Sequence, residues 1–434
     1  MCKAPRMFFG LAIVCAALLT GNAKAITVEV GNCASFPKYP TIQQAVSSVP
    51  AGATVGVCPG TYPEQVVITR NVTLKGLLTS SGSGATIVTP ANGMVANASS
   101  LSSGSPMAAQ IVVQGAAKVN ISNISINGSN NQISGCAPDL VGILYQNSSG
   151  TISQVSVLNE TLDTPDLIGC QSGLGIFVQS GILNSVNGSS TVKVNDSLVE
   201  DYQKNGITGN EQNTTLTVTG SYVVGHGSTT GAAENGIQFG FGAAGSATTN
   251  TVNGNVWAPD TFGDTGDAAA GILIFGSQNI ILTSNNVSNS QYGIAAVDDL
   301  GDGLIADHAS IKSNKISGTH LFDGIEICNN SSTVQSNIIF SSDESGIHID
   351  SDPDNGCNGT GNGITVSANT INTACTGILG NLSNNTIGTN TYYNVGSLNN
   401  PGNSCENANP SVVKAPQAKP VAKNHTSRVV RPVR

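Results

Sequence analysis

The chain has 434 residues, of which 10% are charged and 4% aromatic, with 51 glycines and a formal net charge of −9 at pH 7. The two ends hold nine of the 17 Lys and Arg residues and none of the 26 acids, so the body between them is strongly acidic. This body excludes nucleic-acid binding through phosphate contacts, which depend on clustered basic residues. No segment has the roughly 20 consecutive apolar residues of a membrane-spanning helix.

Residues 1–25 have the features of a secretory signal peptide. Lys3 and Arg6 precede an apolar run from Met7 to Leu19, and Ala23-Lys24-Ala25 follows as a small-x-small cleavage signal. We therefore expect a secreted protein, or one held in the periplasm or at the cell surface.

Residues 26–410 are expected to form one domain that begins with a short helix. Apolar residues recur at helical spacing from Thr41 to Val49, directly after Pro40. Alternating, strand-like runs follow at Thr54–Cys58 and Gln65–Ile68. The helix would cap a stack of coils, because a bare first coil exposes apolar side chains and unpaired strand edges.

A Gly followed by Ile recurs through this domain every 22 to 35 residues. Alternating runs rich in β-branched residues, such as Val119–Ile126, lie between the copies and end in Asn-rich turns. Asn in such turns is expected to stack from coil to coil and to adopt left-handed backbone conformations. The period predicts a parallel β-solenoid with one copy of the phrase in each coil. The copies begin at Gly142, Gly175, Gly206, Gly236, Gly271, Gly293, Gly324, Gly346 and Gly377.

Two parts of the chain resemble the right-handed parallel β-helix proteins of the pectin-lyase-like superfamily. The opening from Tyr39 to Gly76, which contains Cys58-Pro59-Gly60-Thr61-Tyr62, is similar to the start of these proteins, and the Gly-Ile phrases are similar to their coils. The resemblance implies an all-β, right-handed parallel β-helix with a short N-terminal capping helix. That superfamily includes lyases, hydrolases, esterases, adhesins and binding proteins, so the resemblance does not choose an activity.

Eight cysteines follow the signal segment, and an even number in an exported protein predicts disulfides. Residues that are neighbours in sequence are also neighbours in a solenoid. The expected pairs are Cys33 with Cys58, Cys136 with Cys170, Cys328 with Cys357, and Cys375 with Cys405.

The last segment, residues 411–434, has six basic residues among Pro and Ala and no apolar period. We expect a disordered basic tail. It could tether the protein to an anionic envelope surface, or it could be solvated without a partner.

Four ionisable residues converge when the coils are aligned on the Gly-Ile phrase. The residue after each Ile should point outward, and only Glu326 and His348, on adjacent coils, are charged in this column. The same alignment places Asp323 and Asp350 beside them. The sequence therefore predicts an acidic patch on the late coils.

Two kinds of site suit this patch, with a solvated acidic ridge as the third interpretation. Glu326 and Asp350 are candidates for the carboxyl pair of an inverting glycoside hydrolase, with His348 orienting one of them. The alternative is Ca²⁺, which takes about 6 to 8 oxygen ligands. The candidate metal ligands are Asp298, Asp299, Asp302, Asp352 and Asp354.

Three residues outside the patch are candidates for substrate binding. Lys204 and Glu234 occupy matching positions in neighbouring coils, and Lys204 could act as the base of a lyase, although mutual charge pairing explains the two equally well. Trp257 could stack on a sugar ring or pack inside the domain.

We therefore predict an exported, monomeric β-helix protein that binds or processes polysaccharide or cell-envelope glycan at the acidic patch. If it is an enzyme, it is a polysaccharide hydrolase or lyase. The alternative is a non-catalytic surface, adhesion or binding module that presents stacked Asn, Ser and Thr to a partner.

Overall fold

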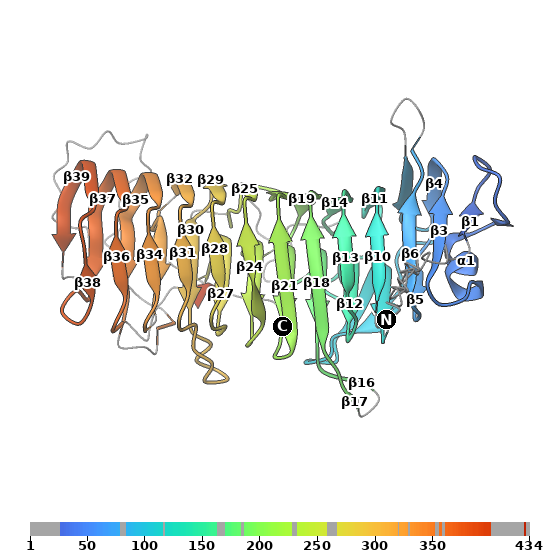
Figure 1. The fold of residues 1–434 in the computed structure, drawn as a ribbon, viewed down its shortest axis with the longest axis horizontal. Helices are drawn as coiled ribbons and strands as arrows, with labels where there is room; N and C mark the ends of the chain where they lie inside the picture. The colour runs from blue at the N-terminus through green and yellow to red at the C-terminus, as the bar shows by residue number, and fades with distance from the viewer. Residues whose placement is uncertain are drawn as a thin grey trace, which may run out of the picture.

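The computed structural model describes residues 27–78, 84–115, 118–162, 170–183, 186–227, 232–257, 267–319, 321–328, 330–351, 356–357, 361–400 and 429–430. The predicted signal segment 1–25 lies outside these residues, and so does the predicted tail 411–434 apart from Val429 and Val430. The described strands stack one coil after another along the long axis of the molecule (Figure 1). No helix among the described residues is long and apolar enough to span a membrane.

The single helix of the described residues caps the first coil, as predicted. Helix α1 (Ile42–Ser48) begins at Thr41, whose hydroxyl accepts a hydrogen bond from the Gln44 amide at 3.1 Å. Both oxygens of the Glu64 carboxylate accept further amides of this first turn, from Ile42 and Gln43, each at 3.0 Å. Ile42 is buried against the end of the solenoid, together with Ala45 and Val46, so the first coil is not exposed.

The first sheet supplies one strand per coil, and all its pairings are parallel. Its 14 strands are, in order, β2 (Lys38–Tyr39), β1 (Thr27–Val30), β3 (Ala53–Val57), β6 (Val72–Gly76), β10 (Val119–Ser122), β13 (Gly150–Ser153), β18 (Ser190–Asn195), β21 (Thr214–Thr219), β24 (Ala244–Thr248), β28 (Ile281–Thr283), β31 (Ser310–Lys312), β34 (Thr333–Gln335), β36 (Thr365–Ser367) and β38 (Thr386–Ile387).

The second sheet has 22 strands and forms two further sides of the solenoid. One side contains β4 (Gly60–Pro63), β7 (Ala85–Val88), β11 (Ile124–Asn127), β14 (Ser156–Glu160), β19 (Leu198–Tyr202), β22 (Tyr222–Val224), β25 (Thr251–Asn253), β29 (Asn286–Ser288) and β32 (Lys315–Thr319). The other side, which we call the site face, contains β5 (Val66–Ile68), β9 (Pro106–Gln114), β12 (Asp139–Gln146), β15 (Leu174–Gln179), β20 (Asn205–Asn210), β23 (Asn235–Gly240), β27 (Ala270–Phe275), β30 (Tyr292–Val297) and β33 (Ile325–Ile327).

The last three coils continue both sides in single long strands, β35 (Ile338–Ile349), β37 (Thr370–Gly380) and β39 (Thr391–Asn400). Short elements outside the coils are β8 (Ala98–Ser99), antiparallel to β9, the hairpin β16 (Ile182–Leu183) and β17 (Val186–Asn187), and β26 (Asp267–Ala268), which pairs with β40 (Val429–Val430). The architecture is the predicted all-β, right-handed parallel β-helix.

The Gly of the repeated phrase is a steric requirement of the stack. At each of the nine copies, an added Cβ would lie 2.9 Å or less from a backbone carbonyl oxygen of the next coil. At Gly271 it would also lie 2.2 Å from Cγ1 of Val287. The Ile of each phrase points the other way and joins one continuous core cluster of buried Val and Ile side chains.

A ladder of Asn side chains, buried except at its last member Asn390, joins the later coils at one corner. Each Asn amide nitrogen donates to the amide oxygen of the next Asn at 2.9–3.0 Å. The predicted stacking is confirmed, and left-handed Asn occurs at other turns, such as Asn123 and Asn289, while at this corner the left-handed residue precedes the ladder Asn. Thr249, Ser284 and Ala368, which each precede a ladder Asn, have φ of 57–58°. The ladder consists of Asn250, Asn285, Asn314, Asn337, Asn369 and Asn390.

The outward side of the site face is buried, and the expectation of an exposed patch there is wrong. Every residue of β27 and β30 is buried, and Leu273 and Tyr292 pack outside the solenoid core in a second cluster that includes Phe322. Segments between strands cover this side: the Asp298 amide donates to the Gly356 carbonyl at 3.0 Å. Strands that are buried on both sides are apolar at almost every position, and the run Ala270–Phe275 already has this pattern.

Three of the four predicted disulfides are present: Cys33–Cys58, Cys136–Cys170 and Cys328–Cys357. They indicate an oxidising compartment. Cys405 lies outside the described residues, so its pairing with Cys375 remains a prediction.

Candidate functional site

The four predicted catalytic side chains lie together at the late end of the site face. Glu326 of β33 and His348 of β35 are direct partners in the parallel pairing, and Asp350 directly follows β35. Asp323 precedes β33 and reaches the same place, where its Oδ2 lies 3.1 Å from Nδ1 of His348. We call these four residues the acid–histidine cluster.

The cluster is compact and buried. One carboxylate oxygen of Glu326, one of Asp350 and one ring nitrogen of His348 all lie within 4.8 Å of one another. Glu326 is 2% exposed, Asp350 0% and His348 6%, so covering segments rather than solvent surround them. The sequence placed these residues together correctly and missed their burial, because the covering segments are not part of the repeat.

Asp323 holds the imidazole in one orientation. Its Oδ1 accepts the Ser345 amide at 3.0 Å and contacts the Ser345 hydroxyl, while its Oδ2 faces His348 Nδ1. The Nε2 atom of His348 is buried and has no hydrogen-bond partner among the described residues. This nitrogen is therefore the one that is left for a ligand.

The protonation of the cluster reflects burial and mutual charge. Burial raises the pKa of Glu326 well above its ordinary value, and the charge of Asp350 raises it further. Burial alone lowers the pKa of His348, but the charge and hydrogen bond of Asp323, with Asp350 and Glu326, raise it to about 10. Tyr292 of β30 makes a side-chain hydrogen bond to Glu326 that lowers the pKa of Glu326.

The role of Glu326 and Asp350 as the carboxyl pair of an inverting enzyme stays a prediction. Inverting glycosidases keep their two carboxyl groups roughly 6.5–9.5 Å apart to admit a water molecule. Oxygens of Glu326 and Asp350 lie within 4.8 Å. This distance joins the nearest oxygens, and Glu326 pairs directly with His348 while Asp350 follows the end of β35.

Two of the predicted calcium ligands, Asp298 and Asp299, accept hydrogen bonds from backbone amides of the segment that follows them. Asp298 Oδ1 accepts the Ala306 amide at 2.9 Å, and Asp299 Oδ1 accepts the amides of Gly301 and Asp302 at 3.1 and 3.2 Å. Asp302 itself is exposed. The remaining two candidates, Asp352 and Asp354, lie outside the described residues.

Lys204 and Glu234 are neighbours, as predicted, but neither is presented to solvent. Both are fully buried. Lys204 Nζ donates to the Ala233 carbonyl at 2.6 Å. Burial raises the pKa of Glu234 well above its ordinary value, while hydrogen bonds from the Val256 and His226 amides and the charge of Lys204 lower it. These contacts favour the charge-pairing interpretation over substrate binding.

Trp257 is 6% exposed and packs against Ala233 and Ala269. Its amide donates to Gln291 Oε1 at 3.1 Å. The burial of the side chain favours the packing interpretation over stacking on a bound sugar.

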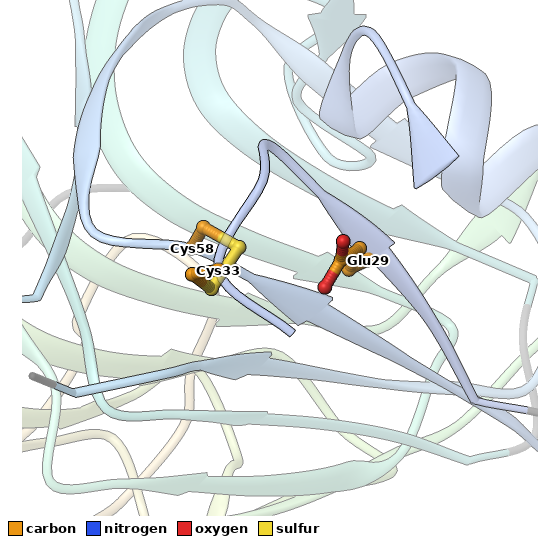
Figure 2. A group of neighbouring side chains, drawn as sticks. All are labelled: Glu29, Cys33 and Cys58. Atoms are coloured by element: carbon orange, nitrogen blue, oxygen red, sulfur yellow. A yellow bond between two sulfur atoms is a disulfide. The ribbon is translucent and has the colours of Figure 1, made fainter. Parts of the chain in front are cut away.

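Three further ionisable residues were not singled out as site residues. His226 Nδ1 contacts Asp201 Oδ1 in a half-exposed pair near Glu234, a contact between coils that no local motif reveals. Near the cap, Glu29 is fully buried beside Cys33 and Cys58 (Figure 2). The two sulfurs are bonded to each other, so these three residues do not form a thiolate metal site.

Solved structures with a similar fold act on saccharides. The catalytic unit of a GH87 α-1,3-glucanase from Streptomyces thermodiastaticus has a TM-score of 0.56 and 15% identity, over 88% of this chain and 65% of that one. The A-module of a mannuronan C-5 epimerase from Azotobacter vinelandii has a TM-score of 0.52 and 14% identity, over 82% of this chain and 92% of the module. A GH136 lacto-N-biosidase from Eubacterium ramulus has a TM-score of 0.51 and 12% identity, over 85% of this chain and 68% of the other.

No protein-family model and no curated protein matches the chain. The chain spans less than two thirds of the glucanase unit that it resembles. At 12–15% identity these likenesses concern the fold. They show that the chain has the parallel β-helix architecture shared by pectin-lyase-like proteins.

Proposed function

We infer that the chain processes polysaccharide, with the acid–histidine cluster as its reaction centre. The observation that carries this inference is the arrangement of Glu326, His348 and Asp350, whose ligand atoms lie within 4.8 Å of one another, with Asp323 orienting the imidazole. Convergence of carboxylates on an oriented imidazole, contributed by adjacent coils, is typical of a catalytic site rather than of solenoid packing.

The similar folds supply the substrate class. The glucanase, the epimerase and the lacto-N-biosidase are named for activities on saccharides, and this supports the same substrate class for the chain. A glycan is also the partner that an exported, disulfide-bonded protein with an acidic body can meet at a cell envelope.

The test is turnover of acidic and neutral polysaccharides by the purified protein, followed as new reducing ends and as absorbance of unsaturated products. Reducing ends alone identify a hydrolase, and both signals together identify a lyase. Asp350→Asn should lower turnover at least about 100-fold, the usual effect of removing an acid–base group. Asp302→Asn, at an exposed acid, is the matched control and should leave it unchanged. Absence of turnover with binding retained would instead identify a binding module.

A further inference from the structure

We propose that Glu326, His348 and Asp350 bind a divalent first-row transition-metal ion, for which Zn²⁺ is the best match by ligand type. This inference deepens the proposed function by naming the cofactor of the same site. Binding of the ion can be measured independently of any polysaccharide, so the two can fail separately.

The spacing of the donor atoms suits one small ion. Catalytic zinc sites have three protein ligands at about 2.0–2.2 Å, which places tetrahedral ligand atoms about 3.4 Å from one another. The three donor atoms here already lie within 4.8 Å. The register of β33 and β35 fixes the backbones of Glu326 and His348 side by side, so the side chains approach from adjacent strands.

The orientation of His348 is a second and independent observation. A metal-ligating His donates its other ring N–H to a carboxylate or carbonyl, which fixes the ring and its tautomer. Asp323 is in that position at Nδ1, and Ser345 in turn orients Asp323. The buried Nε2 atom is left without a hydrogen-bond partner among the described residues, and an unpartnered buried nitrogen is costly unless something binds it.

The charges of the cluster favour a cation as its ligand. The cluster combines three acids with one imidazole in a site that is almost closed to solvent. Burying like charges together is unfavourable unless they are compensated. A His that ligates a metal is a neutral imidazole, so the three acids would carry up to three negative charges, of which a divalent ion would offset two.

The nitrogen donor favours a transition metal over Ca²⁺. Ca²⁺ takes six to eight oxygen ligands, whereas imidazole together with carboxylates suits Zn²⁺ and its first-row neighbours. The acids first considered for calcium, Asp298 and Asp299, direct an oxygen at turn amides instead. Such an ion, when bound, acts as a Lewis acid and lowers the pKa of a bound water.

The experiment uses the disulfide-intact mature protein, freed of metal with a chelator and then titrated calorimetrically with Zn²⁺. We expect one ion per chain, confirmed by elemental analysis, with Zn²⁺ preferred to Ca²⁺. Glu326→Gln and His348→Gln should weaken binding at least 100-fold. Asp323→Asn, at a positioning residue, should weaken it 10- to 100-fold and shift the visible spectrum of the Co²⁺-loaded protein. His226→Gln is the control for a half-exposed imidazole and should bind like the wild type.

Unchanged Zn²⁺ affinity in Glu326→Gln and His348→Gln, or a preference for Ca²⁺, would overturn the proposal. Thermal unfolding in chelator checks that each variant is folded before its affinity is compared. Zinc binding without turnover of any polysaccharide would refute the proposed function and leave the metal site standing. Turnover of a polysaccharide by a protein that binds no Zn²⁺ would refute the metal site and leave the proposed function standing.

Discussion

Replacing Asn285 by Ala should remove the second link of the asparagine ladder. The buried side chain makes four hydrogen bonds: Oδ1 accepts the amide and the side-chain nitrogen of Asn250 at 3.0 and 2.9 Å, and Nδ2 donates to the Ala247 carbonyl and to Asn314 Oδ1, both at 2.9 Å. Each such bond contributes about 1 kcal/mol net. The Asn250 amide loses its side-chain acceptor, so we expect a loss of about 3–4 kcal/mol in the free energy of unfolding.

Denaturant unfolding of the wild type and of Asn285→Ala measures this loss, with Asn286→Ala as the control. Asn286 is the next residue and carries the same side chain, but that side chain is exposed on β29. The control should change stability by less than about 0.5 kcal/mol. If the two variants were equally stable, the ladder would not stabilise the solenoid and the reasoning would be refuted. Hydrogen exchange of the Asn250 amide gives a local check, since it should accelerate only in Asn285→Ala.

Three further changes test the backbone and the charge balance. Gly271→Ala places a Cβ 2.2 Å from Val287 Cγ1, so we expect a loss of about 2 kcal/mol or more in the free energy of unfolding; a neutral result would contradict the steric account. Ala368 is exposed and has a φ of 58°, a conformation that strains an Ala backbone but not a Gly backbone. We expect Ala368→Gly to raise the thermal midpoint by the equivalent of about 0.5–1 kcal/mol. A lower midpoint would refute backbone strain at this corner. Burial raises the pKa of Asp139 to about 7, so the charged carboxylate destabilises the folded state and stability falls as pH rises from about 4 to 7. Asp139→Asn should remove that pH dependence and raise the free energy of unfolding at pH 8 by about 2 kcal/mol. Denaturant midpoints at pH 4.5 and 8 measure the change. An unchanged pH slope would exclude Asp139 as the source of the pH dependence.

The sequence by itself predicted the solenoid because its period is local. In each Gly-Ile phrase, such as Gly271-Ile272, the Gly lies where two coil backbones come close together and the Ile side chain enters the core. The geometry of a coil requires both features. The same register places Glu326 and His348 side by side on adjacent strands. In a parallel pairing that keeps its register, the partner of each residue is found by counting along the chain from the repeated phrase. Three disulfides followed from the same reasoning.

Only the tertiary structure decided what covers the site face. The covering segments differ from coil to coil and have no repeat, so their packing over Glu326 and Trp257 depends on long-range contacts that the period does not encode. Burial in turn determined the chemistry, because the same four side chains on an open surface would be a solvated acidic ridge. Enclosed together, with Asp323 orienting His348, they form the compact buried cluster on which the proposed cation site rests.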